Sequence, residues 1–269
     1  MKIIDITFDL ETTSLSADAA ILQIGAVAWN SSNLINPFFD WGENAQDYTY
    51  ATERNWKGMF LNDLPLTEQF LAGCDIDVDT QRWWMQQDKH VKTSLLDYDN
   101  TGINVCTSLN AFFEFMKEMQ DRTEADAFNL WCQGPDTDIA ILKMTAERFM
   151  NICPHDFPVK HTRFRDCRTI ILTGGLNYML AYAKELKEVE EDDGLLAKKT
   201  GELYDEYIKD PSIVYKYLPQ LPETVKENLK KCGVSDAHNA LYDAAISSWN
   251  TWCVLQNYDA HEKSPENNK

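Results

Sequence analysis

The sequence predicts an α/β fold, in which strands and helices alternate along the chain. Short runs rich in apolar and β-branched residues open the chain, as buried strands do. Segments with apolar residues three and four positions apart follow, as in amphipathic helices. No internal repeat or Pro- or Gly-rich linker divides the 269 residues. We therefore expect one domain over residues 1–258, with a mostly helical insertion at about 174–235 and a disordered tail at 259–269.

The first elements are expected to be strands. Residues 3–8 and 21–29 have the composition of buried strands, and a third strand is expected to begin or lie within residues 37–41. The small, polar residues 12–19 suit a turn between the first two strands. Residues 56–79 have mixed sequence that is typical of loops.

Helices and strands then alternate. Residues 80–87 are expected to form a helix with Asp79 or Thr80 as its N-cap, because acidic and hydroxyl side chains are favoured there. Residues 107–119 have the apolar spacing of an amphipathic helix. Residues 127–132 form a short apolar run that predicts a strand, and residues 136–149 are again helical by their period.

The last third of the chain is expected to be mostly helical. Residues 164–172 are interpreted as one more strand, and helices are predicted at 178–186, 224–231 and 236–255. Gly233 is a candidate C-cap for the second of these helices. The acidic run at 188–193 is interpreted as a solvated loop or a helix end.

The net charge of −18 opposes the binding of long nucleic-acid duplexes, which favours a basic face. A polyanionic substrate would have to be held locally, and bound divalent cations could do so by inverting the sign of an acidic pocket. The charge therefore favours an enzyme that holds one strand end over a protein that coats a duplex.

Composition also predicts where the protein works. The seven cysteines are dispersed without a CxxC pair, which is typical of reduced thiols in the cytoplasm. No apolar run approaches the roughly 20 residues of a membrane span. The chain starts almost directly with a strand-like segment, so we expect no signal peptide and no membrane association.

The segment Asp9-Leu10-Glu11 is the first candidate for chemistry. Two carboxylates two residues apart on a strand point to the same face, and at a strand end they could hold a hard cation. Acidic residues are common near strand ends, so alone this pair is weak evidence.

Asp138 is the second candidate, because it opens a predicted helix directly after a strand. Ile141 and Leu142 lie three and four residues later, so Asp138 shares the core-facing side of that helix. Its neighbour Asp136 is interpreted as the N-cap. Taken singly, a capping role is the better explanation for either residue.

His238 and Asp243 near the start of the last helix are the third candidate. A separation of five residues turns them about 140° apart on an ideal helix. They could therefore meet only if His238 lies at or before the helix start, with Asp236 as a plausible cap. Such a mobile position suits proton transfer to or from water. Alone, an ordinary surface histidine would be preferred.

Together these side chains predict a metal-dependent hydrolase. Four carboxylates can bind two divalent cations, Mg²⁺ or Mn²⁺, about 3.5–4 Å apart for in-line attack at phosphate. A neutral histidine would deprotonate the attacking water. Four clustered acids would repel one another without metal, so a cation is implied.

In their order along the chain, these motifs resemble the DEDDh exonucleases of the ribonuclease H-like superfold. Flanking runs narrow the resemblance to a branch with phage exonucleases, exonuclease VIII-like proteins and bacterial exoribonuclease relatives. Those runs are AILQIGAV at residues 20–27, WWMQQ at 83–87 and RDCRT at 165–169. The resemblance covers residues 3–173 and 236–255 and implies a mixed five-stranded sheet flanked by helices. Two positions depart from the family pattern, with Ser14 in place of glycine and Thr137 in place of an aromatic residue.

The resemblance implies roles for the candidate residues. Metal would be bound by Asp9, Glu11, Asp138 and Asp243, with His238 as the general base.

The resemblance also implies substrate contacts. Thr12 would approach the terminal nucleotide through its backbone, and Trp84 and Gln87 would contact a base by stacking and by edge recognition. Core packing of the tryptophan pair is the stronger alternative. Arg168 would orient an acid or a phosphate, or form an ion pair with Asp166 or another carboxylate.

The expected activity is 3′-5′ exonuclease hydrolysis that releases nucleoside 5′-monophosphates from single-stranded DNA or RNA. Resemblance to phage enzymes favours DNA slightly and would place the protein in a host cytoplasm. Short oligonucleotides or signalling nucleotides are an alternative substrate class, and a non-catalytic interaction protein on the same fold is another alternative. The oligomeric state is left open, a homodimer included.

Overall fold

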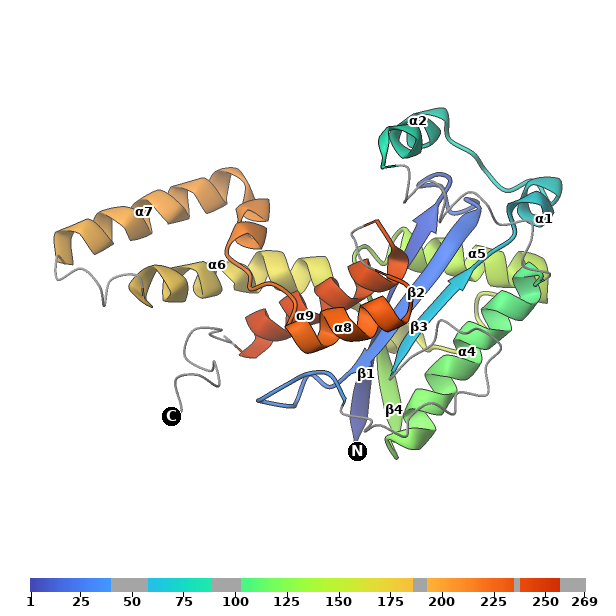
Figure 1. The fold of residues 1–269 in the computed structure, drawn as a ribbon, viewed down its shortest axis with the longest axis horizontal. Helices are drawn as coiled ribbons and strands as arrows, with labels where there is room; N and C mark the ends of the chain where they lie inside the picture. The colour runs from blue at the N-terminus through green and yellow to red at the C-terminus, as the bar shows by residue number, and fades with distance from the viewer. Residues whose placement is uncertain (40–57, 89–102, 186–192, 235–237, 257–269) are drawn as a thin grey trace.

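A five-stranded mixed sheet forms the centre of the computed structural model, which describes residues 1–39, 58–88, 103–185, 193–234 and 238–256 (Figure 1). The strands are β1 (Ile3–Thr12), β2 (Ile21–Trp29), β3 (Met59–Asp63), β4 (Ala127–Cys132) and β5 (Phe164–Asp166). Their order is β3-β2-β1-β4-β5, with β1, β4 and β5 parallel and β2 antiparallel to both neighbours. This confirms the predicted α/β class and the mixed five-stranded sheet flanked by helices.

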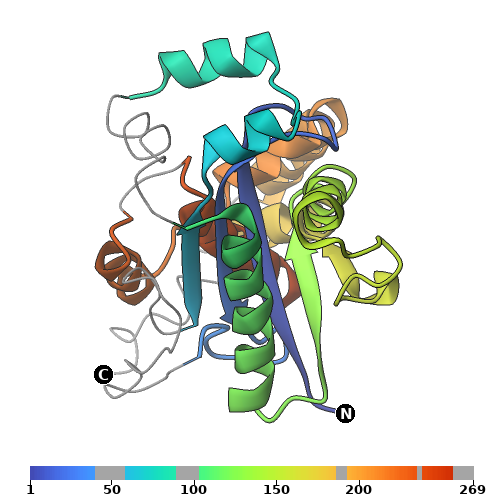
Figure 2. The same ribbon diagram turned by 90° about the vertical axis from the view of Figure 1, so that its right-hand side faces the viewer.

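Helices cover both faces of the sheet (Figures 1 and 2). The helices are α1 (Leu66–Leu71), α2 (Val78–Gln86), α4 (Val105–Arg122), α5 (Asp138–Met150), α6 (Cys167–Glu185), α7 (Asp193–Lys209), α8 (Glu223–Lys231) and α9 (Ala240–Gln256), with 3-10 turns η1 (His161–Arg163) and η2 (Pro211–Lys216). One core lies between the sheet and helices α4 and α5, and a second lies between the sheet and helices α6, α8 and α9. Helices α6 and α7 extend away from the sheet (Figure 1). None of the helices in the described ranges is long and apolar enough to cross a membrane.

The side chains of β1 alternate between the two cores. Ile6 and Phe8 are fully buried in the core with α4 and α5. Thr7 faces the opposite side, where its hydroxyl accepts a hydrogen bond from the Trp29 indole at 2.9 Å. Because successive residues of a strand point to opposite faces, Asp9 and Glu11 lie on the same side as Thr7. The strand thus presents both carboxylates to the face that α9 covers.

Helix α9 packs directly on the strands β1 and β2 because Gly25 leaves room for it. A Cβ atom at Gly25 would lie only 2.0 Å from the Leu241 backbone nitrogen. Gly25 pairs with Asp9 across the sheet, so the first turn of α9 lies beside the carboxyl end of β1.

The third strand was expected in the wrong segment. It lies at Met59–Asp63, within the stretch interpreted as a loop. Of the expected strand at 37–41, Phe38 forms only an isolated bridge to Trp29, and residues 40–41 lie outside the described ranges. β3 has five residues and is buried at four consecutive positions, so it shows no alternating pattern that would distinguish it from a loop.

The predicted strand at 164–172 is also wrong beyond its first three residues, because α6 begins at Cys167. The Asp166 carboxylate accepts hydrogen bonds from the Arg168 backbone nitrogen at 3.0 Å and the Thr169 hydroxyl at 2.5 Å. These are the contacts of a helix N-cap, which outweigh the strand-like composition.

Two predicted N-caps are wrong as well. Helix α2 is capped by Asp77, whose carboxylate accepts a hydrogen bond from the Thr80 backbone nitrogen at 2.7 Å. Neither Asp79 nor Thr80 is its cap.

At α5 the N-cap position is Thr137, and Asp136 is not the cap. The backbone nitrogens of Thr137 and Asp138 donate instead to the Gly134 carbonyl, at 2.9 and 3.1 Å. The tight turn after β4 supplies these bonds without a side-chain cap.

Two predicted helix starts are also wrong, because the helix expected from residue 178 begins at Cys167 and the helix expected from residue 236 begins at Ala240. The helices expected at 107–119 and 224–231 and the strand at 127–132 are confirmed. The C-cap of α8 is Cys232 rather than the predicted Gly233, which follows it with φ +77°, as a glycine just after a helix C-terminus often does. The acidic run at 188–193, apart from Asp193 at the start of α7, lies outside the described residues, as do Asp236 and the tail.

Candidate metal centre and adjoining pocket

Three of the predicted carboxylates converge at the end of β1. Asp9, Glu11 and Asp243 each offer an oxygen atom, and these atoms lie within 4.8 Å of one another. Glu11 is buried, and its Oε1 has no hydrogen-bond partner among the described residues. A buried carboxylate oxygen without a partner is costly, and a cation would remove that cost. The donor set is the all-oxygen type that Mg²⁺ and Mn²⁺ prefer.

Asp138 approaches the same edge from α5. Strands β1 and β4 are parallel, so the residues that follow β4 lie beside the end of β1. The negative charge of Asp138 helps to raise the pKa of both Asp9 and Glu11. Asp138 therefore belongs to the same electrostatic cluster, although it is not one of the three residues whose ligand atoms lie within 4.8 Å of one another.

Every carboxyl group of this cluster has a raised pKa, and burial is the largest cause in each case. For Asp9, the charges of Glu11, Asp138 and Asp243 add to the effect of burial. The pKa of Glu11 is raised to about 8. For Asp138 it is raised to about 7 against the opposing charge of Arg168, and for Asp243 to about 6 against that of His238.

These shifts predict that the metal-free protein loses stability as the pH rises. A group whose pKa is raised by folding binds its proton more tightly in the folded state, so its contribution is complete below about pH 4. That contribution is lost as the pH rises through the values of about 6, 7 and 8 for Asp243, Asp138 and Glu11. In EDTA, the Tm should fall between pH 5 and pH 8.5.

Glu11→Gln provides the control for that measurement, since the overall charge of the chain also affects the Tm. The variant should show a smaller fall in Tm over the same pH range. Parallel curves for the two proteins would contradict the assigned cause.

Arg168 lies beside this cluster without pairing with Asp166 as an ion pair. Its guanidinium donates to the Gln133 carbonyl at 2.7 Å and passes over Gly134. The Asp166 carboxylate is occupied by the capping contacts described above. The positive charge of Arg168 lowers the pKa of Asp138, against the larger effect of burial.

His238 precedes α9, as its spacing from Asp243 requires. Its φ is +61°, and its backbone nitrogen donates to Asp243 Oδ2 at 3.1 Å. Its side chain is exposed and meets the Trp83 ring edge-on, with 5.0 Å between ring centroids. The left-handed turn thus fixes the Asp243 carboxylate by the backbone and leaves the imidazole at the surface.

A pocket of about 480 Å³ adjoins Glu11. Trp83 and Trp84 of α2 both line it but differ in exposure, at 42% and 3%. The Trp84 indole donates to the Thr12 carbonyl at 3.0 Å, which ties α2 to the end of β1. Trp84 packs against Leu22, so its ring is largely a core element.

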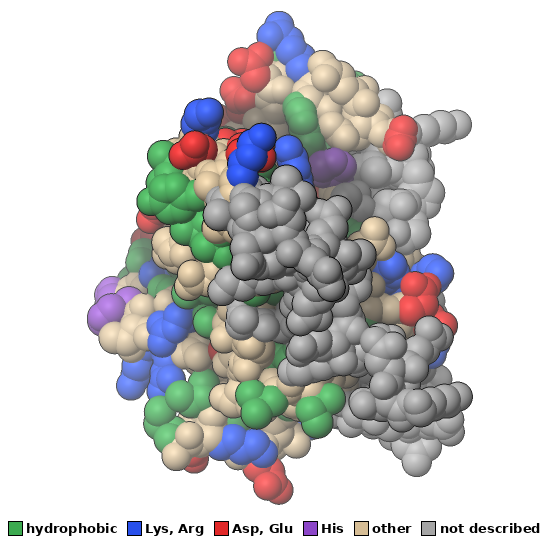
Figure 3. All heavy atoms as spheres, turned by 90° about the vertical axis from the view of Figure 1, so that its left-hand side faces the viewer, with side chains coloured by type: hydrophobic (Ala, Val, Ile, Leu, Met, Phe, Trp, Pro, Cys, Tyr) green, Lys and Arg blue, Asp and Glu red, His purple; other side chains and the backbone are tan. Residues whose placement is uncertain are grey.

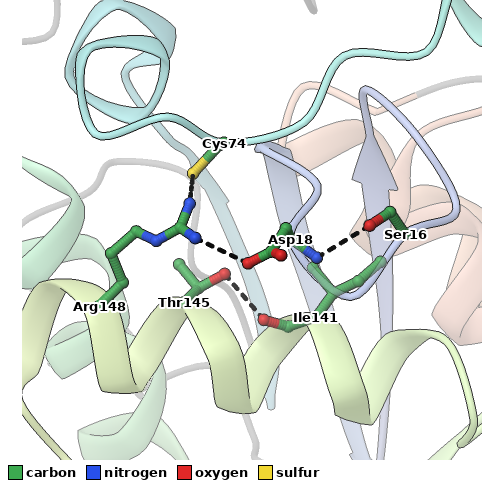
Figure 4. Close-up of polar contacts among 6 residues, drawn as sticks. All are labelled: Ser16, Asp18, Cys74, Ile141, Thr145 and Arg148. Atoms are coloured by element: carbon green, nitrogen blue, oxygen red, sulfur yellow. Dashed lines mark hydrogen bonds and ion pairs between the residues drawn. The ribbon is translucent and has the colours of Figure 1, made fainter.

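The turn after β1 is anchored on its far side by α5. Figure 4 shows Arg148 reaching the Asp18 carboxylate at 2.7 Å and the Cys74 sulfur at 3.0 Å. The Thr13 hydroxyl donates to the Asp75 carbonyl at 2.7 Å. These contacts hold the segment before α2 against the turn, and α2 lies beyond the end of the sheet where β1 finishes (Figure 1).

The structure brings most, but not all, of the predicted site residues together. Asp9, Glu11, Asp138, Asp243 and His238 lie together. Thr12 and Trp84 line the pocket. Gln87 does not, because its amide turns back to the Trp83 carbonyl at 3.1 Å.

Trp83 is the residue that sequence reasoning missed. The WWxxQ run drew attention to the helix but did not show which ring faces outward. Because the Trp84 ring packs against Leu22 in the core, the neighbouring Trp83 ring points to another side of α2 and is partly exposed.

Comparison with known proteins gives one family. A family model described as the 3'-5' exoribonuclease Rv2179c-like domain matches residues 5–194, more than half of the 269-residue chain. The match includes Asp9, Glu11 and Asp138, whereas His238 and Asp243 lie beyond it and are joined to the site by the fold. Among curated proteins, no sequence matches the chain. The chain belongs to the Rv2179c-like 3'-5' exoribonuclease domain family.

Proposed function

We propose that this protein is a metal-dependent exoribonuclease that releases nucleoside 5′-monophosphates from the 3′ end of single-stranded RNA. The observation that carries the proposal is the convergence of Asp9, Glu11 and Asp243 beside a pocket, with a buried Glu11 oxygen that lacks a partner among the described residues. The family description names RNA. It gives no support to the slight preference for DNA inferred from phage relatives.

Asp9, Glu11, Asp138 and Asp243 would hold two cations, Mg²⁺ or Mn²⁺. Bound there, the cations would supply the positive charge that activates water and stabilises the leaving oxygen in phosphodiester hydrolysis. The cluster suits them because burial and mutual repulsion make four ionised carboxylates unfavourable without positive charge.

His238 would accept the proton of the attacking water. Its side chain is exposed and contacts Trp83, which lines the pocket, and Asp243 accepts a hydrogen bond from the His238 backbone N–H rather than from its ring. Neither ring nitrogen is therefore needed for positioning that carboxylate. Arg168 would favour the ionised form of Asp138, since its charge opposes the rise in the pKa of that group, and would attract the substrate phosphate.

The terminal nucleoside would occupy the pocket beside Glu11. Thr12 and the exposed ring of Trp83 line it, and an aromatic face can stack on any base. Trp84 would hold α2 in place against Thr12 through its indole N–H. Gln87 would stabilise the end of α2 through its bond to the Trp83 carbonyl and would not contact a base.

Trp83→Ala is expected to raise KM for an RNA oligomer, because base stacking contributes about 1–3 kcal/mol per base. That range corresponds to roughly a 5- to 150-fold change in binding. Initial rates over a range of substrate concentrations would measure it. Met85→Ala on the same helix, exposed and absent from the pocket lining, should leave KM unchanged. Equal effects of the two substitutions would argue against stacking by Trp83.

Short substrates are the second candidate class. The net charge is −18. Figure 3 draws the face that lies on the left-hand side of Figure 1, and on its described part the positive side chains are dispersed among acidic and hydrophobic ones. A long RNA needs a basic track along its backbone, whereas one terminal phosphate needs only the metal centre. Rates for oligomers of two to thirty nucleotides would separate the two classes.

Digestion of matched RNA and DNA oligomers, labelled at the 3′ or the 5′ end, would test the proposal. With Mg²⁺ or Mn²⁺ we expect stepwise shortening from the 3′ end, release of nucleoside 5′-monophosphates, faster cleavage of RNA, and no reaction in EDTA. Metal-loaded protein that leaves every oligomer intact would overturn the proposal in favour of a non-catalytic interaction protein.

A further inference from the structure

Gln23 lies at the junction between the sheet and the helix that carries Asp243. Its side chain is fully buried in β2. Its Oε1 accepts a hydrogen bond from the backbone nitrogen of Ala240 at 2.9 Å, and its Nε2 donates to Asp63 Oδ1 at 2.6 Å. Ala240 is the first residue of α9, so a sheet side chain satisfies the start of that helix.

The register of the sheet places Gln23 next to the metal centre. Gln23 pairs with Glu11 on β1 and with Asp63 on β3. Residues directly opposite each other in antiparallel strands share a face, so the three side chains form one row across the sheet. The row runs from Asp63, through Gln23, to the Glu11 carboxylate.

Asp63 determines which way the Gln23 amide points. A carboxylate only accepts hydrogen bonds, so the NH₂ group of Gln23 must face Asp63. The amide oxygen then faces the Ala240 N–H, which is one of the backbone donors that a helix start leaves without an intrahelical partner. An apolar side chain at position 23 would leave that buried N–H unpaired.

The position of α9 fixes two residues of the site. His238 lies two residues before Ala240, and Asp243 lies three residues after it. The next row of the sheet has Gly25 opposite Asp9, and the backbone of Ala240 and Leu241 packs on that glycine. Gly25 allows α9 to lie close to the sheet, and Gln23 adds a hydrogen bond that sets the orientation of the first turn of α9.

We propose that Gln23, oriented by Asp63, is a positioning residue for the metal centre. It sets the first turn of α9 so that Asp243 meets Asp9 and Glu11 and His238 reaches the mouth of the site. This inference rests on the proposed metal-dependent function.

Exchange of the two polar groups tests the inference. Gln23→Glu places a carboxylate against Asp63 and removes the donor, so the row is broken. Combining it with Asp63→Asn restores one donor and one acceptor in reversed order, and the new carboxylate at position 23 can still accept from Ala240. The double variant also has the same charge as the natural protein.

Gln23→Glu is expected to raise the Kd for Mn²⁺, measured by titration calorimetry, by about tenfold and to lower kcat, as loss of an outer-sphere partner does. The double variant should recover most of both losses. Hydrogen exchange of the peptide spanning residues 238–245 in EDTA should rise in Gln23→Glu and return towards the natural value in the double variant. This third readout needs neither metal nor activity.

The inference is overturned if Gln23→Glu lowers the Tm but leaves the Mn²⁺ Kd and kcat unchanged, or if the double variant is no better than the single one. Should Gln23→Glu fail to fold, Gln23→Met, of similar length but without polar atoms, gives the same three readouts. An inactive natural protein that binds no Mn²⁺ would instead refute the proposed function itself. If the natural protein is active and binds Mn²⁺ but the double variant recovers neither property, only the role of Gln23 would be refuted.

Discussion

Asp9→Asn is expected to abolish RNA hydrolysis while raising the stability of the metal-free protein. Its carboxyl group has a raised pKa because it is buried and lies near Glu11, Asp138 and Asp243. The amide keeps the shape of the side chain but removes one of the charged ligands of the proposed metal site. Loss of metal-ion charge stabilisation is worth several kcal/mol, which corresponds to a fall in kcat on the order of 10³-fold or more.

The prediction is specific because one substitution should abolish activity and yet raise the Tm of the metal-free protein. At pH 8 in EDTA, the raised pKa of Asp9 disfavours the folded state, because the carboxyl group gives up its proton more readily in the unfolded chain, so Asp9→Asn should raise the Tm. With Mg²⁺ or Mn²⁺ present the natural protein should gain stability by binding the cation in its folded state, and the variant should gain little.

Asp126→Asn is the matched control, because Asp126 lies at the opposite end of β1 and contacts the Lys2 backbone nitrogen at 2.7 Å. It should leave kcat and the metal-induced rise in Tm unchanged. Retention of activity in Asp9→Asn, or an equal metal-induced rise in both variants, would refute the four-carboxylate site.

The convergence of the acidic side chains could be predicted from the sequence better than the elements around them. The alternation of β1 is encoded locally, so Asp9 and Glu11 could be placed on one face without a structure. The five-residue gap between His238 and Asp243 required the histidine to lie at or before the helix start if the two were to meet, and α9 does begin after it, at Ala240, although the helix was predicted from residue 236.

The errors arose where tertiary contacts decide between local alternatives. The strand β3 is recognisable only from its pairing with β2, since its buried residues do not alternate. The end of β5 is determined by the Asp166 carboxylate, which turns a strand-like run into a helix start.

Side chains that position the site were the hardest to predict. Gln23 is a polar residue within an apolar strand, and its role depends on Asp63 and on the start of α9, 40 and 217 residues away in the chain. Trp83 and Trp84 are adjacent and chemically identical, and only the packing of α2 over Leu22 separates the buried ring from the partly exposed one. No periodic pattern in the sequence contains that information.

His238→Asn is expected to lower kcat by about 10²–10⁴-fold, the usual contribution of a general base, without weakening metal binding. His238 contacts Asp243, a proposed metal ligand, through its backbone nitrogen, at 3.1 Å, so a change of side chain leaves that hydrogen bond in place. Asparagine is preferable to alanine because the φ of +61° is a left-handed conformation that asparagine tolerates better.

Single-turnover rates and the Mn²⁺ Kd, measured on the same preparation, would separate the two roles of this residue. A fall in kcat at constant Kd assigns the proton transfer to the imidazole. A Kd that rises by the same factor as kcat falls would mean that the ring acts on the Asp243 carboxylate, and the water would then need another base. The exposed ring and the backbone contact favour the first result, since the geometry of Asp243 does not depend on the imidazole.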